Sequence, residues 1–351
     1  MPIFSASDID VIKQGLYKVP TKVTTEEANF KFLQNVLFGN PSEGTDLDYL
    51  VMDYRSRGIA LSEEAIKGAD PNRVNYNSGF NEKAIFGLYY NDEDEVACDQ
   101  AENRVWGEPL DERWSAVERM TYLLADKRDR IILSHDQMME LACASTILNG
   151  YFTTKTGGQQ TFPMSSALLA VSGANMTTNP VSVLGAGIKA LLKTKGSKVT
   201  RLIMNADTAA SVLGSTKMLS LLDNRRTFGN EVRYQALDEN GAGFCGTINL
   251  PGVGTIEVIS YMGGYTDGNG TYQYYIPNNT AILAPDRVGH KGYCGVYVDN
   301  GLFTGKAGVD HGVHIWAEQK NLPYATHIQV QSAPCPMLTA IDRYCVFTNI
   351  S

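Results

Sequence analysis

The chain has 351 residues, 43% of them hydrophobic, and a formal net charge of −8. This composition excludes a disordered chain, and the length fits two lobes or one elongated subunit. The absence of a basic tail or stripe argues against sequence-driven nucleic-acid binding. The sequence contains no run of about 18 apolar residues and no basic region followed by an apolar stretch at its start, so we expect neither a membrane-spanning helix nor a secretory signal.

The net charge resides in one segment, residues 91–112, which contains nine acids and one base, Arg104. Acids and bases balance in the remainder of the chain. The six cysteines are scattered and form no CxxC pair, which is typical of buried free thiols in a reducing compartment.

The first elements are predicted to be a helix and a long hairpin. Thr24 to Phe38 has a capping threonine, early glutamates and a stop at Gly39-Asn40-Pro41, which predicts a helix. Residues 46–54 alternate like a strand, with Leu47, Tyr49 and Val51 on one face, and residues 84–90 are again strand-like. The long, mostly polar connection between these strands is typical of an excursion that is functional or contacts a neighbour.

A long helix is predicted over residues 111–149, which contain neither proline nor glycine. Asp111 is expected to cap its start, and Asn149-Gly150 its end. An unbroken helix of this span would be about 58 Å long. Either the helix bends or the molecule is elongated.

The remaining sequence predicts a mixed α/β lobe followed by terminal strands. A Gly-, Ser- and Thr-rich crossing at 151–180 leads to a helix from Pro180 to about Lys195 and a strand over 199–204. A second helix begins at Asn205 or Asp207. Further elements are expected as a helix at 215–224, strands at 255–261 and 280–283, and several strands among the last 60 residues.

Motifs for chemistry are weak. Residues 184–190 fit GxGxxA, but a capping signal precedes them instead of the strand that a dinucleotide site needs. His311 and His314 have a metal-like spacing without a clear third ligand, and the acidic run 91–95 lacks the spacing of an EF-hand loop. We therefore expect no catalytic residues, no metal and no cofactor.

The chain nevertheless resembles one family, the lambda-like major capsid proteins (the E family) of tailed bacteriophages. Arg55-Ser-Arg-Gly58 and Leu221–Arg226 resemble family segments, and so does the order of arm, long hairpin, long helix, α/β lobe and terminal strands. The closest likeness lies in the C-terminal third, in the segments Tyr275–Leu283, His290–Val296, Ile328–Pro334 with its Gln-Ser-Ala-Pro, Pro336–Leu338 and Asp342–Val346.

The resemblance implies an α+β chain with the Hong Kong 97-type capsid fold. The implied parts are an N-terminal arm (1–45), an extended E-loop hairpin (46–90), a peripheral domain with a long spine helix (91–150), an axial α/β domain (151–285), and C-terminal strands that return to the peripheral domain (286–351).

The implied function is that of a major capsid protein, not an enzyme. It would self-assemble into hexamers and pentamers that form the icosahedral head shell around packaged double-stranded DNA, without sequence-specific binding and without a membrane. The expected location is the virion, after assembly in the host cell cytoplasm. Expected partners are other copies of the chain, a separate scaffolding protein (because no long helical segment precedes the arm), a portal protein and a decoration protein.

Candidate inter-subunit contacts join two hairpin arginines of one copy to acids of the next. The residues are Arg55 and Arg57 with Asp92, Glu93, Asp94 and Glu95. Two alternatives stay open at this point. One is a nanocompartment shell of the encapsulin type, and the other is a two-domain nucleotide-dependent enzyme that uses Gly185 and Gly187.

Overall fold

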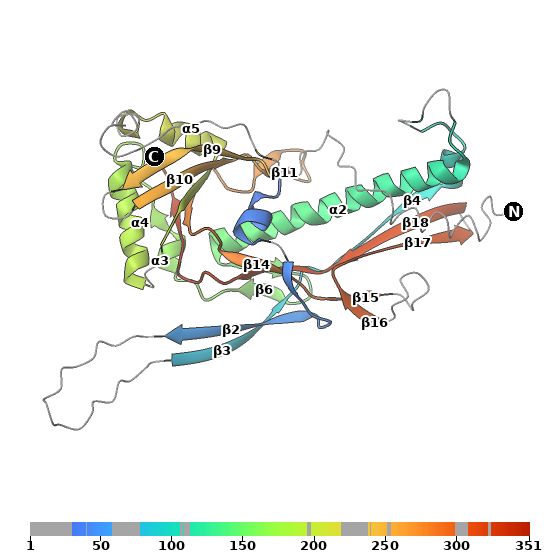
Figure 1. Ribbon diagram of the computed structural model, residues 1–351, viewed down its shortest axis with the longest axis horizontal. Coiled ribbons are helices and arrows are strands. Elements are labelled where there is room, and N and C mark those ends of the chain that lie inside the picture. Colours follow the sequence, from blue (N-terminus) through green and yellow to red (C-terminus); the bar gives the residue numbers. More distant parts are fainter. Residues whose placement is uncertain are drawn as a thin grey trace, which may run out of the picture.

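The computed structural model describes residues 30–39, 41–57, 78–105, 108, 113–194, 198–218, 238, 240–250, 254–298, 308–321 and 324–351. Figure 1 shows an elongated molecule in which helix α2 runs from an α/β lobe to a small sheet at the opposite end, while a two-stranded hairpin protrudes beside the lobe. Of the two possibilities for a long helix, the structure therefore shows the elongated molecule. Within the described residues, no helix is both long and apolar enough to cross a membrane.

Helix α2 spans Ala116–Asn149 without interruption and is about 51 Å long. Its start lies at Ser115, whose side chain accepts a hydrogen bond from the Glu118 N–H while the Glu118 carboxylate accepts from the Ser115 N–H. The prediction of Asp111 as the cap is therefore wrong, because this reciprocal capping box fixes the first turn further along the chain. The predicted end is confirmed, with Gly150 in the left-handed conformation at φ 74°.

A three-stranded antiparallel sheet packs on the first two-thirds of α2. Its strand order is β17 (Val313–Asn321), β18 (Tyr324–Ser332), β4 (Tyr90–Ala97). One face of this sheet contributes apolar side chains to a core shared with α2 and with the 3-10 turn η2 (Cys98–Ala101). We call the opposite face the outer sheet face. Its positions are Asn91, Glu93 and Glu95 on β4, Gln329 and His327 on β18, and Trp316 and Glu318 on β17.

The predicted hairpin is present as β2 (Tyr49–Arg57) paired antiparallel with β3 (Ser78–Phe86). The predicted strand over 84–90 is wrong, since it is broken at Gly87, where a Cβ would lie 2.8 Å from the Cys294 sulfur. The strand expected at 46–54 is confirmed from Tyr49 onward, whereas residues 46–48 form a bend. Its buried face is that of Leu50 and Met52, and Val51 on the other face is exposed, as is Leu47 in the bend.

The α/β lobe contains a six-stranded mixed sheet covered by short helices. The Asn205 side chain caps the helix α5 and accepts from the Thr208 N–H at 2.8 Å, which confirms one of the two predicted starts. The strand order is β7 (Val171–Ser172), β20 (Cys345–Thr348), β13 (Ala281–Ala284), β8 (Arg201–Asn205), β10 (Gly254–Tyr261), β9 (Ala242–Leu250), and the helices are α3 (Ser166–Leu169), α4 (Pro180–Thr194) and α5 (Ala206–Leu213).

The centre of the molecule joins the lobe to α2. A three-stranded sheet there has the order β1 (Pro41–Gly44), β14 (Gly289–Tyr293), β19 (Pro334–Leu338), and the helical turn η1 (Leu33–Leu37) packs beside it. Smaller hairpins complete the described structure: β5 (Tyr151–Thr154) with β6 (Gly158–Thr161), β11 (Gly264–Thr266) with β12 (Tyr272–Tyr274), and β15 (Gly295–Val298) with β16 (Gly308–His311).

Most other predicted elements are confirmed, namely the helix from Pro180 and the strands near 199–204, 255–261 and 280–283. Of the helix predicted at 24–38, only the last turns lie among the described residues, and most of the one at 215–224 lies outside them. All six cysteines are buried and free, as expected.

Candidate assembly surfaces

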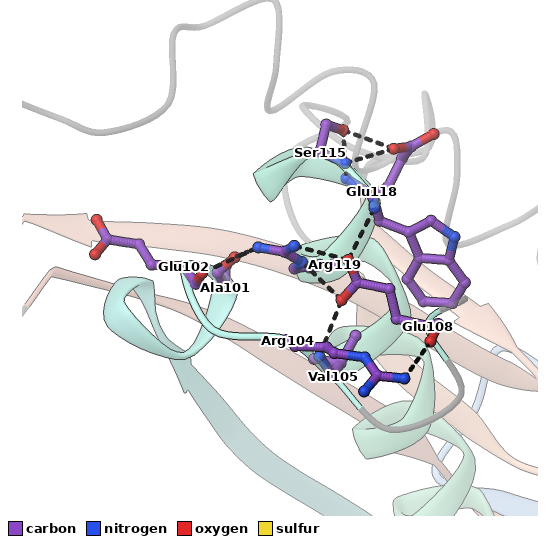
Figure 2. Close-up of polar contacts among 9 residues, drawn as sticks. Ala101, Glu102, Arg104, Val105, Glu108, Ser115, Glu118 and Arg119 are labelled. Carbon is purple, nitrogen blue, oxygen red and sulfur yellow. Dashed lines mark hydrogen bonds and ion pairs between the residues drawn. The ribbon is translucent and has the colours of Figure 1, made fainter. Parts of the chain in front are cut away.

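The start of α2 is held by a buried ion pair between Arg119 and Glu108 (Figure 2). The guanidinium donates two hydrogen bonds to the carboxylate, at 2.7 and 3.0 Å, and a third to the Glu102 carbonyl at 3.0 Å. The Trp114 and Val105 N–H groups also donate to this carboxylate, at 2.9 and 3.2 Å. The charged bonds from Arg119 outweigh burial and lower the pKa of Glu108 to about 2. The end of the acidic segment is thus attached to the helix of its own chain.

The four acids of β4 divide between two faces because successive side chains of a strand point to opposite sides. Asp92 and Asp94 point towards α2, where Asp92 lies 2.9 Å from His135 Nε2 and Asp94 lies 2.9 Å from Lys127 Nζ. These two carboxylates already have cationic or polar partners within the chain. They tie the edge strand of the small sheet to the helix.

Glu93 and Glu95 project from the outer sheet face instead, with side chains 43% and 58% exposed. His327 of the neighbouring strand lies between them, contacting Glu93 through Nδ1 and Glu95 through Nε2, the latter at 3.3 Å. The exposed Glu318 is directly opposite His327 on β17. Trp316 is half-buried in the next row of the sheet, in line with Glu93. The outer sheet face therefore offers carboxylates and one aromatic ring to a partner.

The other candidate residues, Arg55 and Arg57, lie in the outer half of β2, opposite Phe80 and Ser78 of β3. Figure 1 places this end of the hairpin and strand β4 on opposite sides of the molecule. The fold therefore does not bring the arginines and the acids together within one chain. A contact between them requires two copies.

One set of side chains has the order of a hydrolase triad. Ser332 Oγ lies 2.9 Å from His135 Nδ1, and His135 Nε2 lies 2.9 Å from Asp92. Ser332 is only 1% exposed, however, and the adjacent cavity of about 30 Å³ has room for water but not for an acyl substrate. These hydrogen bonds join β18, α2 and β4 and form a structural network.

The GxGxxA motif lies inside α4 and serves packing. A Cβ on Gly187 would lie 2.5 Å from the Phe347 ring, so glycine is needed for the helix to approach β20. No strand delivers these glycines to a phosphate, since the motif begins one turn into the helix. Nor do the described residues contain a cluster of three metal-ligating side chains, at His314 or elsewhere.

Near its other end, α2 carries a buried glutamate that joins three parts of the chain. Glu140 is fully buried and accepts hydrogen bonds from the Leu33 and Gln34 N–H groups, at 2.7 and 2.9 Å, and from the Tyr261 hydroxyl at 2.6 Å. The carboxylate therefore accepts from N–H groups at the start of the turn η1, as anions do at the N-terminus of a helix. Through Tyr261 it also binds the end of strand β10 in the lobe.

Burial raises the pKa of Glu140 to about 7, against the lowering effect of these donors and of Lys291. The Tyr261 hydroxyl also lies 3.3 Å from the Phe30 carbonyl, so it can donate there when Glu140 is protonated. Sequence reasoning missed both glutamates. The available signal for Glu140 was a lone acid among the apolar residues Met138 to Cys143; Glu108 gave none.

A long helix backed by a small sheet, a separate α/β lobe and a protruding hairpin define the fold of tailed-phage capsid subunits, the Hong Kong 97-type α+β fold. A protein assigned as the capsid protein of a prophage of Escherichia coli CFT073 superposes with a TM-score of 0.67, at 14% identity over 98% of this chain and 99% of that one. The capsid of cyanophage A-1(L) matches with a TM-score of 0.50, at 12% identity over 95% and 96%. The mature capsid of bacteriophage PhiM1 also gives 0.50, at 9% identity over 93% and 91%.

The chain belongs to the family described as phage major capsid protein E, whose sequence model matches residues 21–349. No match is found among the curated proteins. Family and fold together assign a structural role in which copies of the chain associate to form the phage head shell, as a component of the virion.

Proposed function

We propose that the chain assembles into hexamers and pentamers that close into an icosahedral shell around double-stranded DNA. The observation that supports this most directly is the hairpin β2–β3, which protrudes from the body of the molecule (Figure 1). Such a hairpin suits a heterologous contact, in which a surface of one copy meets a different surface of the next. The acidic net charge is consistent with a shell that encloses DNA without gripping it.

The domain division follows from the same proposal. The hairpin 46–90 is the E-loop that extends over a neighbour, residues 91–150 with β17 and β18 form the peripheral domain, and residues 151–285 form the axial domain whose loops meet at the centre of each capsomer. Strand β20 pairs with β13 and therefore belongs with the axial sheet. The arm 1–45 lies mostly outside the described residues.

Electron microscopy of the purified recombinant chain tests the proposal. Closed shells, or open sheets and tubes built from six-fold rings, are the expected result, and no nucleotide or metal should be needed. Co-expression with a scaffolding protein should convert irregular assemblies into shells of one size, in the host cytoplasm. Portal and decoration proteins are the further partners proposed. A discrete dimer or tetramer at every protein concentration would contradict the proposal.

We propose the narrower contact of Arg55 and Arg57 of one copy with Glu93 and Glu95 of its neighbour. Support comes from the position of these two carboxylates on the outer sheet face, where their nearest cationic group is the half-buried His327, whereas Asp92 and Asp94 face α2 and contact His135 and Lys127. Each exposed pair would contribute only about 0–1 kcal/mol, but the contact is repeated at every copy of the shell.

Replacing both arginines by serine should therefore make the particles dissociate at a lower salt concentration than the wild type. The double change Glu93→Gln and Glu95→Gln should give the same shift. The matched control is the double change Asp92→Asn and Asp94→Asn. It should lower the thermal stability of the free subunit, and the salt concentration at which particles dissociate should stay unchanged. The measurement is particle yield by sedimentation across a salt series. Unaltered yield and salt stability in both double variants would contradict the pairing.

A further inference from the structure

Two buried cysteines lie where the hairpin joins the central sheet. Cys294 follows the last residue of β14, and Cys335 is the second residue of β19. The Cys294 N–H donates to the Ala333 carbonyl at 2.8 Å, which extends the antiparallel register of these strands by one position. Gly292 is directly opposite Cys335, and residues two apart on a strand share a side, so both thiols project from the same side of the sheet.

The Cys294 sulfur is surrounded by hydrogen-bond donors. It accepts from the Cys335 S–H and from two backbone N–H groups, those of Gly87 just beyond β3 and of Leu50 in β2. The approach at Gly87 is close, since a Cβ there would lie 2.8 Å from this sulfur. Hydrogen bonds are strongest when the acceptor is ionised, so three donors directed at one sulfur atom stabilise its thiolate form.

The two thiols of this pair differ in acidity. The Cys335 S–H and the two N–H groups lower the pKa of Cys294, against the raising effect of burial and of the Asp48 carboxylate. Burial raises the pKa of the other five thiols, Cys335 included. Cys335 therefore stays protonated when Cys294 ionises, and its S–H also lies within reach of Met337 Sδ, at 3.7 Å.

Acidity and access thus point to different cysteines. Cys245 is the most exposed of the six thiols at 8%, whereas Cys294 is only 1% exposed. The thiolate is the reactive form of cysteine, so a reagent small enough to enter the fold should prefer Cys294.

We propose that Cys294 and Cys335 form a dithiol that hydrogen peroxide oxidises to a disulfide. Peroxide is a small, uncharged oxidant that can reach buried side chains through local opening of the structure. The Cys294 thiolate attacks one peroxide oxygen, so that an S–O bond forms, the O–O bond breaks, and the departing hydroxide takes up the proton that the thiol released. The oxidation needs one chain alone, so its outcome is independent of the proposed shell function.

Cys335 completes the reaction. Its sulfur attacks the Cys294 sulfur, the S–S bond forms as the S–O bond breaks, and the departing hydroxide leaves as water with the Cys335 proton. The two thiols lose two electrons in all, and one peroxide is reduced to two waters.

The disulfide changes the contacts at the start of the hairpin. Bonded sulfur atoms are about 2.05 Å apart, closer than two hydrogen-bonded sulfurs. Closing the bond therefore moves the Cys294 sulfur towards Cys335 and away from the Gly87 and Leu50 N–H groups. A disulfide sulfur is also a weaker acceptor than a thiolate. Oxidation should therefore loosen the attachment of both hairpin strands to the central sheet.

Peptide mapping by mass spectrometry, after treatment of the purified folded chain with hydrogen peroxide, tests the proposal. The expected first product is a pair of peptides joined through Cys294 and Cys335 that a reductant separates. It should form about tenfold or more faster than the oxidation of Cys245, because the thiolate is the nucleophile. Earlier oxidation of the more exposed Cys245, or a bond from Cys335 to Cys143 of α2 instead, would overturn the proposal.

The variant Cys335→Ser tests the role of the second thiol. Serine keeps a hydrogen-bond donor towards Cys294 but cannot form a disulfide, so Cys294 should accumulate as the sulfinic acid under the same treatment. Cys245→Ser is the matched control and should leave the rate of disulfide formation unchanged. A Cys294 thiol that stays reduced in the Cys335→Ser chain would refute its assignment as the attacking group.

Hydrogen exchange of the oxidised chain measures the effect on the hairpin. The Leu50 and Gly87 amides should exchange about tenfold faster than in the reduced chain, and a reductant should restore the original rates. The Leu88 amide is the internal control, because it donates to the Pro334 carbonyl at 2.8 Å and should keep its rate. Equal exchange of the Leu50 and Gly87 amides in the two states would show that the disulfide does not loosen the hairpin.

Discussion

Replacing Glu140 with alanine should destabilise the free subunit by about 3 kcal/mol or more, because each buried donor left without an acceptor costs roughly 1–3 kcal/mol. The Leu33 and Gln34 N–H groups and the Tyr261 hydroxyl all donate to this carboxylate. Denaturant unfolding of the unassembled subunit measures the loss. The change should also release the turn η1 from α2, which hydrogen exchange at the Leu33 and Gln34 amides would detect.

Glu140→Gln is the matched control, since it keeps the shape and one acceptor oxygen. Its main effect should be on pH dependence. The pKa of Glu140 in the folded chain is about 7, above the ordinary value of 4.5, so between these pH values the folded state holds a proton that the unfolded state has released. The free energy of unfolding therefore falls as pH rises through this window and is level above it.

The size of that fall is on the order of 3 kcal/mol, at about 1.4 kcal/mol for each pH unit of difference. The glutamine variant cannot bind this proton, so the fall should be missing from its profile. Unfolding measured from pH 4.5 to 8 in both proteins gives the difference. Parallel profiles would show that Glu140 does not titrate in this range.

Gly289→Ala should have the second large effect, a loss of about 3 kcal/mol or more from steric overlap. A Cβ at this position would lie 2.1 Å from the Met337 carbonyl oxygen and 2.8 Å from the Phe38 ring. The carbonyl belongs to β19, and β14 is paired on both sides, with β1 and with β19, so neither backbone can withdraw.

The control is the same substitution at Gly185, where nothing lies within 4 Å of the added methyl group. Alanine in that helix interior should stabilise the free subunit by about 0.5–1 kcal/mol. Thermal unfolding of the two variants should therefore shift in opposite directions. A Gly289→Ala subunit with the wild-type melting temperature would contradict the packing of the central sheet.

Local signals in the sequence predicted the elements that depend on short-range pattern. Absence of proline and glycine predicted the long helix, and Gly150 predicted its end, because both effects act within one or two turns. The cap was misplaced since Asp111 and Ser115 are both good capping residues, and only Glu118 three residues later distinguishes them. The order of the predicted elements along the chain was then enough to indicate the capsid-protein family, and the family match confirms this resemblance.

What the sequence could not predict depends on contacts between distant segments. Alternation along β2 indicated the faces of the strand but not which one meets the core, since Leu50 is buried by residues far along the chain. In the same way, nothing near Glu140 reveals that its partners Leu33 and Tyr261 lie more than 100 residues away on either side. The separation of the β4 acids into two pairs likewise required the positions of α2 and β18.

Because α2 is unbroken, a small tilt at one end produces a larger displacement at the other. Its Glu140 end is fixed to the lobe and its first turns support the small sheet, with about 36 Å of helix between Ala116 and Glu140. A tilt of only about 5° at the Glu140 end would move the far end by about 3 Å, enough to make or break a hydrogen bond. A small change of angle at the buried carboxylate would therefore be magnified at the acidic outer sheet face.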